Sequence, residues 1–185
     1  MNFKILAIFA FILTGIISCK KEGDPDPIDL EDQLTNPFCN DPRAINYNWG
    51  FPGKADSTVC QFPVDSFLGN WIFTDSVFYE DETFSEVVIR NLQFFSTEDT
   101  LLQHMEVHGW CMNNNIIYLT ADRFNNALLD DLIENHGGQL GCSSEDTLSG
   151  HFNKNFIGND SMRITVSEKG AEGTKNHRGL AIRSQ

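Results

Sequence analysis

The chain has 185 residues and a formal net charge of −13, with 26 acidic against 13 basic side chains. Such an excess of negative charge repels phosphate backbones and argues against nucleic acid as a partner. The length suffices for one domain with a hydrophobic core plus a linker, and fifteen Phe among many Gly, Asn, Asp and Ser residues favour β structure.

The N-terminus has the features of a secretion signal. One cation, Lys4, precedes an uncharged run from Ile5 to Ile17. In a helix this run spans roughly 20 Å, short of the roughly 30 Å hydrocarbon core of a bilayer, so we predict a cleaved signal peptide at residues 1–18. The sequence Ile16-Ile17-Ser18-Cys19 resembles the lipobox of bacterial lipoproteins. The resemblance implies that Cys19 is acylated and anchors the protein to a membrane. A plain signal peptide with an incidental Cys is the alternative.

The residues after Cys19 suggest where the anchor lies. The run KKEGD at 20–24 resembles the basic-then-acidic routing signal of Bacteroidetes-type lipoproteins, although Gly23 interrupts its acidic pair. The resemblance implies attachment to the outer membrane with the domain facing the cell exterior. Residues 19–37 contain three prolines and clustered acids, which predicts an extended linker.

Four cysteines remain once Cys19 is assigned to the lipid. An even number in an exported chain predicts two disulfides. Of the three possible pairings, the sequential one closes the shortest loops, namely Cys39–Cys60 and Cys111–Cys142. A zinc site is the alternative, but the sequence has no C-x-x-C spacing and no His near Cys39 or Cys60.

Residues 38–62 resemble a short cysteine-bounded module of exported Bacteroidetes proteins. The matching positions are Cys39, Asp41, Pro42, Ala44, Asn46, Tyr47, Asn48 and Cys60. The residues just before Cys60 depart from the acid-Gly-Ser-Cys ending of that module. We interpret the segment as a disulfide-closed structural loop, with Ca²⁺ binding by its carboxylates and amides as the alternative.

Strand-like runs dominate the rest of the chain. They occur at 71–79, 85–95, 101–110, 115–124, 147–157 and 161–170, separated by Asp-, Asn- and Gly-containing turns. The run 127–134 has helical spacing instead, with Asn126 as a candidate N-cap. We therefore predict a mainly β domain, a small antiparallel barrel or sandwich with one short helix.

Three short motifs resemble those of lipocalin-like (calycin-type) domains. They are Phe67-Leu68-Gly69-x-Trp71, Leu148-Ser149-Gly150-x-Phe152 and Arg163-Ile164-Thr165-Val166. The resemblance implies a lipocalin-like β domain over residues 63–185, with Trp71 across one end of the barrel. It also implies a late Arg packed on Trp71, for which Arg163, Arg178 and Arg183 are the candidates.

One set of polar residues has the spacing of a metal site. In a strand His104, Glu106 and His108 share one face, so they are candidate ligands of a metal in a hydrolase. An exposed polar strand face is the alternative interpretation. The sequence has no recognisable nucleophile motif or catalytic triad, and we predict no catalytic residue and no cofactor.

The predicted function is therefore a non-enzymatic, lipid-anchored binding module. Its ligand would be a small hydrophobic molecule, a glycan or a protein, and a metal-dependent hydrolase is the alternative function. A hollow barrel would favour a small ligand, whereas a filled interior would favour a structural or partner-docking role.

Overall fold

The structure, a computed structural model, describes residues 34–48, 53–97, 102–112, 115–131, 138–154 and 160–184. The chain divides into two units, residues 1–36 with 52–54 and residues 37–51 with 55–185. The predicted signal peptide, Cys19 and most of the predicted linker lie outside the described residues. Among the described residues, no helix is both long and apolar enough to cross a membrane.

The cysteine-bounded segment 38–62 is built from short elements. They are β1 (Pro37–Phe38), β2 (Lys54–Ala55) and the 3-10 helix η1 (Ser57–Val59). Helix η1 begins after Asp56, whose carboxylate accepts a hydrogen bond from the backbone N–H of Thr58. The disulfide Cys39–Cys60 closes the segment, as the sequential pairing predicts.

Nine further strands form one antiparallel sheet, which follows the 3-10 helix η2 (Pro63–Ser66). The strands are β3 (Gly69–Tyr79), β4 (Phe84–Ser96), β5 (His104–His108), β6 (Ile117–Ala121), β7 (Asn126–Leu129), β8 (Gln139–Leu140), β9 (Thr147–Asn153), β10 (Ser161–Gly170) and β11 (Gly173–Arg183). Their order is β10-β11-β3-β4-β5-β6-β7-β9-β8, and β10 also pairs with β9. That last pairing closes eight strands into a barrel and leaves β8 attached to β9. The predicted fold class is thus confirmed as a mainly β, closed antiparallel barrel.

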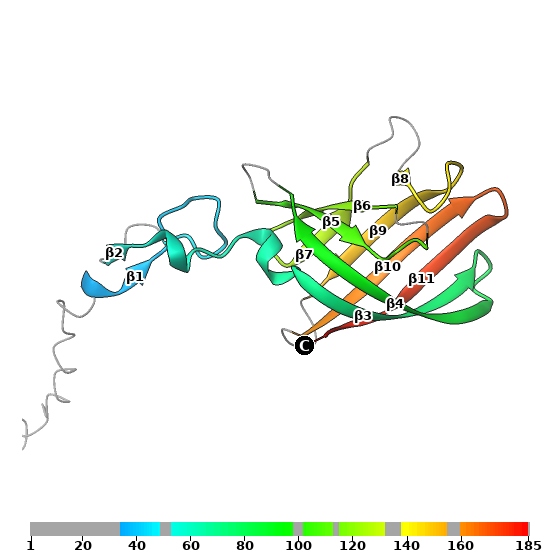
Figure 1. Cartoon of the computed structure of the whole chain (residues 1–185), viewed down its shortest axis with the longest axis horizontal. Helices are drawn as coiled ribbons and strands as arrows, with labels where there is room; N and C mark the ends of the chain where they lie inside the picture. The colour runs from blue at the N-terminus through cyan, green and yellow to red at the C-terminus, as the bar shows by residue number, and fades with distance from the viewer. Residues whose placement is uncertain are drawn as a thin grey trace, which may run out of the picture. The chain divides into compact units, whose positions relative to one another are not determined.

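The register defines the two ends of the barrel. Gly69 lies opposite Phe94, and Trp71 opposite Arg183, at the end that we call the Trp71 end. The β3–β4 and β10–β11 hairpins both extend to the opposite end, which we call the polar end (Figure 1).

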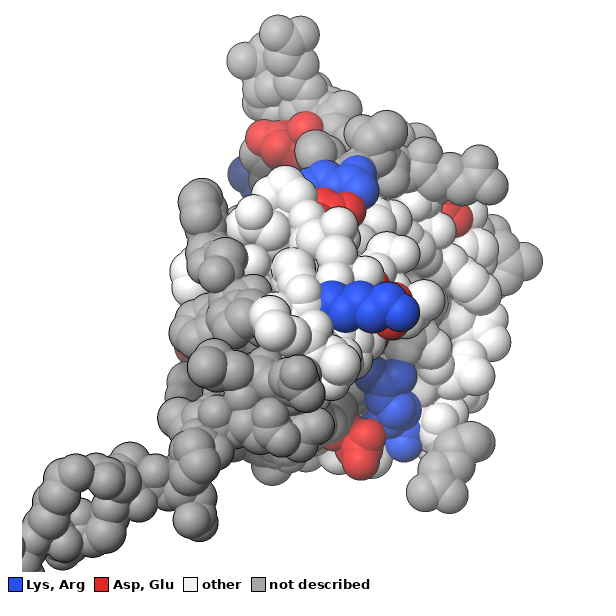
Figure 2. Space-filling view, turned by 90° about the vertical axis from the view of Figure 1, so that its left-hand side faces the viewer, with Lys and Arg blue, Asp and Glu red and all other residues white. Residues whose placement is uncertain are grey.

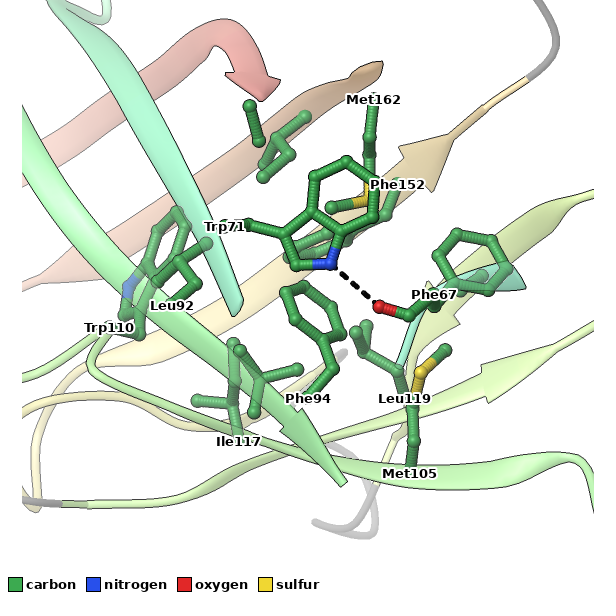
Figure 3. Close-up of a cluster of buried hydrophobic side chains, with 14 of the residues drawn as sticks. Phe67, Trp71, Leu92, Phe94, Met105, Trp110, Ile117, Leu119, Phe152 and Met162 are labelled. Atoms are coloured by element: carbon green, nitrogen blue, oxygen red, sulfur yellow. Dashed lines mark hydrogen bonds between the residues drawn. The ribbon is translucent and has the colours of Figure 1, made fainter. Parts of the chain in front are cut away.

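Alternate side chains point into the barrel because a strand repeats every two residues. On β3 the buried positions are Trp71, Phe73, Asp75 and Val77. The apolar core is made of large, fully buried side chains packed around Trp71 (Figure 3). The largest of them are Trp71, Trp110, Phe67, Phe73, Phe94, Phe152, Leu92, Met105, Ile117, Leu119, Leu148 and Met162. Burying each contributes about 1.5–3 kcal/mol to folding.

The predicted helix over 127–134 is wrong where the structure describes it. Residues 126–129 form β7, which pairs with both β6 and β9. Ala127 is buried and Leu128 is exposed, an alternation with a period of two. The carboxylate of Asp122 accepts the backbone N–H of Phe124 and of Asn126, so it fixes the turn that leads into the strand. Residues 132–134 lie outside the described part.

Candidate binding site at the polar end

Five side chains form a polar cluster inside the barrel near its polar end. They are Asp75 on β3, Arg90 on β4, Trp110 just after β5, Glu168 on β10 and His177 on β11. Asp75, Trp110 and His177 are each no more than 3% exposed. Burying ionisable groups is costly unless they are paired, so such clusters mark functional-site candidates.

Asp75 is the centre of the cluster. Its Oδ2 accepts hydrogen bonds from His177 Nδ1 at 2.8 Å and from Arg90 Nε at 2.9 Å. Its Oδ1 is also buried but has no hydrogen-bond partner among the described residues. A buried, unpaired carboxylate oxygen requires an explanation, such as a ligand or an ordered water.

His177 lies between two carboxylates. Its Nδ1 faces Asp75, and its Nε2 lies 3.1 Å from Glu168 Oε2. Burial alone would lower the pKa of His177, but the hydrogen bonds to Asp75 and Glu168 outweigh it and raise the pKa above 6.5. The hydrogen bond from His177 in turn lowers the pKa of Glu168 below 4.5. The geometry therefore favours an imidazolium that donates to both carboxylates.

Trp110 packs against the cluster. Its ring stacks on Phe73 at 5.9 Å between centroids and lies edge-on to His177 at 5.4 Å. The guanidinium of Arg90 lies over the indole at 4.9 Å and donates to the backbone oxygen of Trp110 at 2.6 Å. The indole Nε1, although buried, has no hydrogen-bond partner among the described residues. The cluster thus holds one unpaired acceptor and one unpaired donor.

Gly109 sets the path of the backbone into Trp110. It has φ +86°, and a Cβ built on it would lie 2.0 Å from the backbone oxygen of Asn91. Only glycine fits so close an approach to β4 at this φ. This contact brings the chain just after β5 against the backbone of β4.

A surface hollow of about 280 Å³ adjoins the cluster. Glu168 belongs to both, because it contacts His177 and also lines the hollow. The other charged or hydroxyl side chains around the hollow are Ser143, Glu145, Asp146, Glu172 and Lys175. The hollow therefore meets the cluster at Glu168.

The second predicted disulfide lies beside Trp110. Cys111 is bonded to Cys142, as the sequential pairing predicts. Cys111 belongs to the connection between β5 and β6, and Cys142 to the connection between β8 and β9. The bond therefore ties two connections together and fixes the residue that follows Trp110.

The Trp71 end has the arrangement that the lipocalin-like resemblance implies. Trp71 Nε1 donates to the backbone oxygen of Phe67 at 2.7 Å, drawn as the dashed line in Figure 3. Of the three candidate arginines, Arg183 lies over Trp71, whereas Arg178 lies over Phe78 and pairs with Glu82. Arg163 is exposed on the outer face of β10.

The candidate metal ligands share the outer face of β5, as predicted, but they do not converge. Two residues that are two positions apart in a strand lie about 6.8 Å from each other along it. His104 and His108 are four positions apart, so roughly 13 Å separates them. His104 Nδ1 instead contacts Thr120 Oγ1 at 3.0 Å, and His108 Nε2 contacts Glu106 at 3.4 Å. No group of three or more metal-ligating side chains occurs in the described part of the chain.

The polar side chains of the cysteine-bounded segment bond within the segment. The Asn46 amide donates to the backbone oxygen of Val59 and accepts from the N–H of Gln61. The Asp41 carboxylate is held by Arg43. That arrangement lowers the pKa of Asp41 to about 2, mainly through the hydrogen bond from Arg43. These bonds brace the loop, which favours the structural interpretation over Ca²⁺ binding.

Charges on the described surface are mixed. On the face drawn in Figure 2, basic and acidic side chains lie beside one another. Around the hollow, four carboxylates face one ammonium group. The hollow is therefore negative, and it disfavours anionic ligands.

The sequence contained a signal for this cluster that the strand pattern alone did not reveal. Asp75 occupies an inward position between Phe73 and Val77, where alternation calls for an apolar residue. His177 occupies the same kind of position on β11, a strand that the sequence pattern did not predict. A polar residue at an inward strand position therefore indicates a buried polar cluster.

Comparison with known proteins adds little to this picture. No known protein family and no curated protein matches the chain. A solved structure of a redesigned beta barrel aligns with 66% of this chain and 96% of its own, at 12% identity and a TM-score of 0.39.

Proposed function

We propose that the protein is a lipid-anchored, outward-facing, non-enzymatic barrel that binds a small neutral ligand rich in hydroxyl groups, such as a sugar unit. The observation that carries the proposal is the pair of buried, unpaired polar atoms, Asp75 Oδ1 and Trp110 Nε1. A hydroxyl group both donates and accepts, so it is the chemistry that satisfies such a pair.

The balance of charge supports a neutral ligand. Asp75 and Glu168 face Arg90 and a protonated His177, so negative and positive charges are equal in number. Adding a charged ligand would leave a net charge in a buried site, which is costly. The acidic rim of the hollow further disfavours phosphates and carboxylates.

The shape supports a small, polar ligand. Large apolar side chains pack across the barrel interior, which argues against a long hydrophobic molecule in the core. The hollow beside Glu168 has about 280 Å³, near the lower limit for ligand sites. A single sugar ring suits this size.

Binding can be tested directly. Neutral monosaccharides would be titrated into the purified protein and followed by isothermal calorimetry and amide NMR shifts. We expect binding by at least one of them, with the largest shifts at Glu168 and His177, and weaker binding by Trp110→Phe, which removes the indole donor. Asp81→Asn, at an exposed turn, is the matched control. Shifts that leave the cluster untouched, or no binding across the panel, would refute the ligand assignment.

The anchor needs its own test. Cells that express the protein would be fed labelled palmitate, with Cys19→Ser as the comparison. We expect label and membrane fractionation for the native protein, loss of both for the variant, and protease access on intact cells. An unlabelled native protein would overturn the lipoprotein proposal and leave the barrel's binding role standing.

A further inference from the structure

We infer that the Cys111–Cys142 disulfide is a catch that holds Trp110 against the polar cluster, and that its reduction by a dithiol releases the indole from the cluster. The inference concerns regulation of the proposed binding site. Its ligand-binding experiment rests on the proposed function. The movement of Trp110 can be measured without any ligand.

The covalent connection is short. Trp110 lies between Gly109, which is pressed against the backbone of Asn91, and Cys111, which is bonded to Cys142. The residue is therefore fixed on both sides along the chain. Neither cysteine belongs to a strand of the barrel, so we expect the strand pairings to remain when the bond is broken.

The closed position leaves polar groups unsatisfied. With Trp110 in place, its own Nε1 and the Oδ1 of Asp75 are both buried without partners among the described residues. Leaving buried donors and acceptors unpaired is unfavourable, so water gains hydrogen bonds to these two atoms once the indole moves. Stacking on Phe73 and the bond from Arg90 to the backbone oxygen oppose that movement. The disulfide adds to them by restricting the alternatives open to the loop.

The chemistry is an ordinary thiol–disulfide exchange. A thiolate of the dithiol attacks one sulfur of the bond and forms a mixed disulfide, and its second thiol then displaces the protein thiol. Two electrons pass from the dithiol to the bond, so the products are two protein thiols and one oxidised dithiol. Cys142 is only partly buried, whereas Cys111 is 4% exposed, so the first attack falls on Cys142.

The experiment follows the tryptophans individually. The protein would carry Cys39→Ser and Cys60→Ser, so that Cys111–Cys142 is its only disulfide, and 5-fluorotryptophan at its three Trp positions. Fluorine NMR with a soluble paramagnetic quencher then reports the exposure of each indole, with the Trp110 signal assigned by Trp110→Phe. Trp71, buried at the other end of the barrel, is the internal control.

We expect a dithiol to raise the quenching of Trp110 several-fold while Trp71 stays protected. Cys111→Ala with Cys142→Ala should show the same exposure without reductant. Thiol alkylation verifies that reduction is complete. If Trp110 is then still protected from the quencher, the catch is overturned. Exposure of Trp110 and Trp71 together would overturn it as well, since the bond would then hold the whole barrel.

A ligand arm separates the two proposals. If Trp110 opens and monosaccharide affinity falls several-fold on reduction, because the indole donor has left the site, both stand. If Trp110 opens but no sugar binds in either state, the proposed ligand fails and the catch remains. If sugar binds equally before and after reduction while Trp110 stays closed, the catch fails and the binding function remains.

Discussion

Arg183 lies over the indole of Trp71, with 4.4 Å between the guanidinium carbon and the ring centroid. The same guanidinium donates to the backbone oxygens of Leu68 and Ser66. It therefore joins the last strand to the segment that precedes the first strand of the barrel.

Replacing this arginine should destabilise the barrel. Arg183→Met keeps much of the aliphatic stem but removes the cation–π contact and both hydrogen bonds, so we expect a loss of about 2–3 kcal/mol in the free energy of unfolding. Urea denaturation provides the measurement. Arg178→Met, which removes an exposed pair with Glu82, is the control and should have a much smaller effect. Equal losses in the two variants would contradict a special role for Arg183.

Gly109 should tolerate no side chain. Gly109→Ala combines an unfavourable positive φ with an overlap against the backbone oxygen of Asn91. Gly173→Ala is the matched control, because Gly173 has φ +108° but a Cβ added to it would meet nothing within 4 Å. We expect about 1 kcal/mol for Gly173→Ala and more than about 2 kcal/mol for Gly109→Ala. Thermal and urea unfolding of the two variants would reveal whether the overlap matters.

The cluster should make stability depend on pH. The raised pKa of His177 means that its contribution is fully present below 6.5 and is lost as pH rises through the folded-state value. The lowered pKa of Glu168 means that its contribution is present above 4.5 and is lost as pH falls through its folded-state value. Their joint contribution should be greatest between about pH 4.5 and 6.5.

This pH dependence can be assigned with one variant. His177→Gln removes the titrating ring, so the loss of stability above pH 6.5 should be smaller than in the native protein. Denaturation midpoints from pH 4 to pH 9 would provide the comparison, with His104→Gln on the outer face of β5 as the control. An unchanged profile in His177→Gln would show that other groups carry the effect.

The histidines of β5 should not act together on a metal. Because His104 and His108 are roughly 13 Å apart along the strand, we expect Zn²⁺ to raise the melting temperature no more for the native protein than for His108→Ala. Differential scanning calorimetry with and without Zn²⁺ is the measurement. A stabilisation that disappears in His108→Ala would revive the metal-dependent hydrolase.

The sequence by itself indicated the strand-rich character of the domain, favoured the sequential pairing of four cysteines and placed Trp71 at the start of the barrel. These features depend on local alternation, on loop length and on one short motif. The anchor at Cys19 stays a prediction from the sequence, outside the described residues.

Only the tertiary structure decided the rest. Residues 126–129 have helical spacing, yet β6 and β9 flank them and satisfy their backbone groups as a strand. The sequence pattern did not predict strand β11, because its inward positions carry His177, Gly179 and the small Ala181 in place of large apolar residues. Asp75 and His177 are 102 positions apart in the chain, and they meet because the last strand pairs with the first strand of the barrel. A buried charge needs a partner that no local pattern specifies, so barrel closure, and not the sequence around either residue, creates the polar cluster.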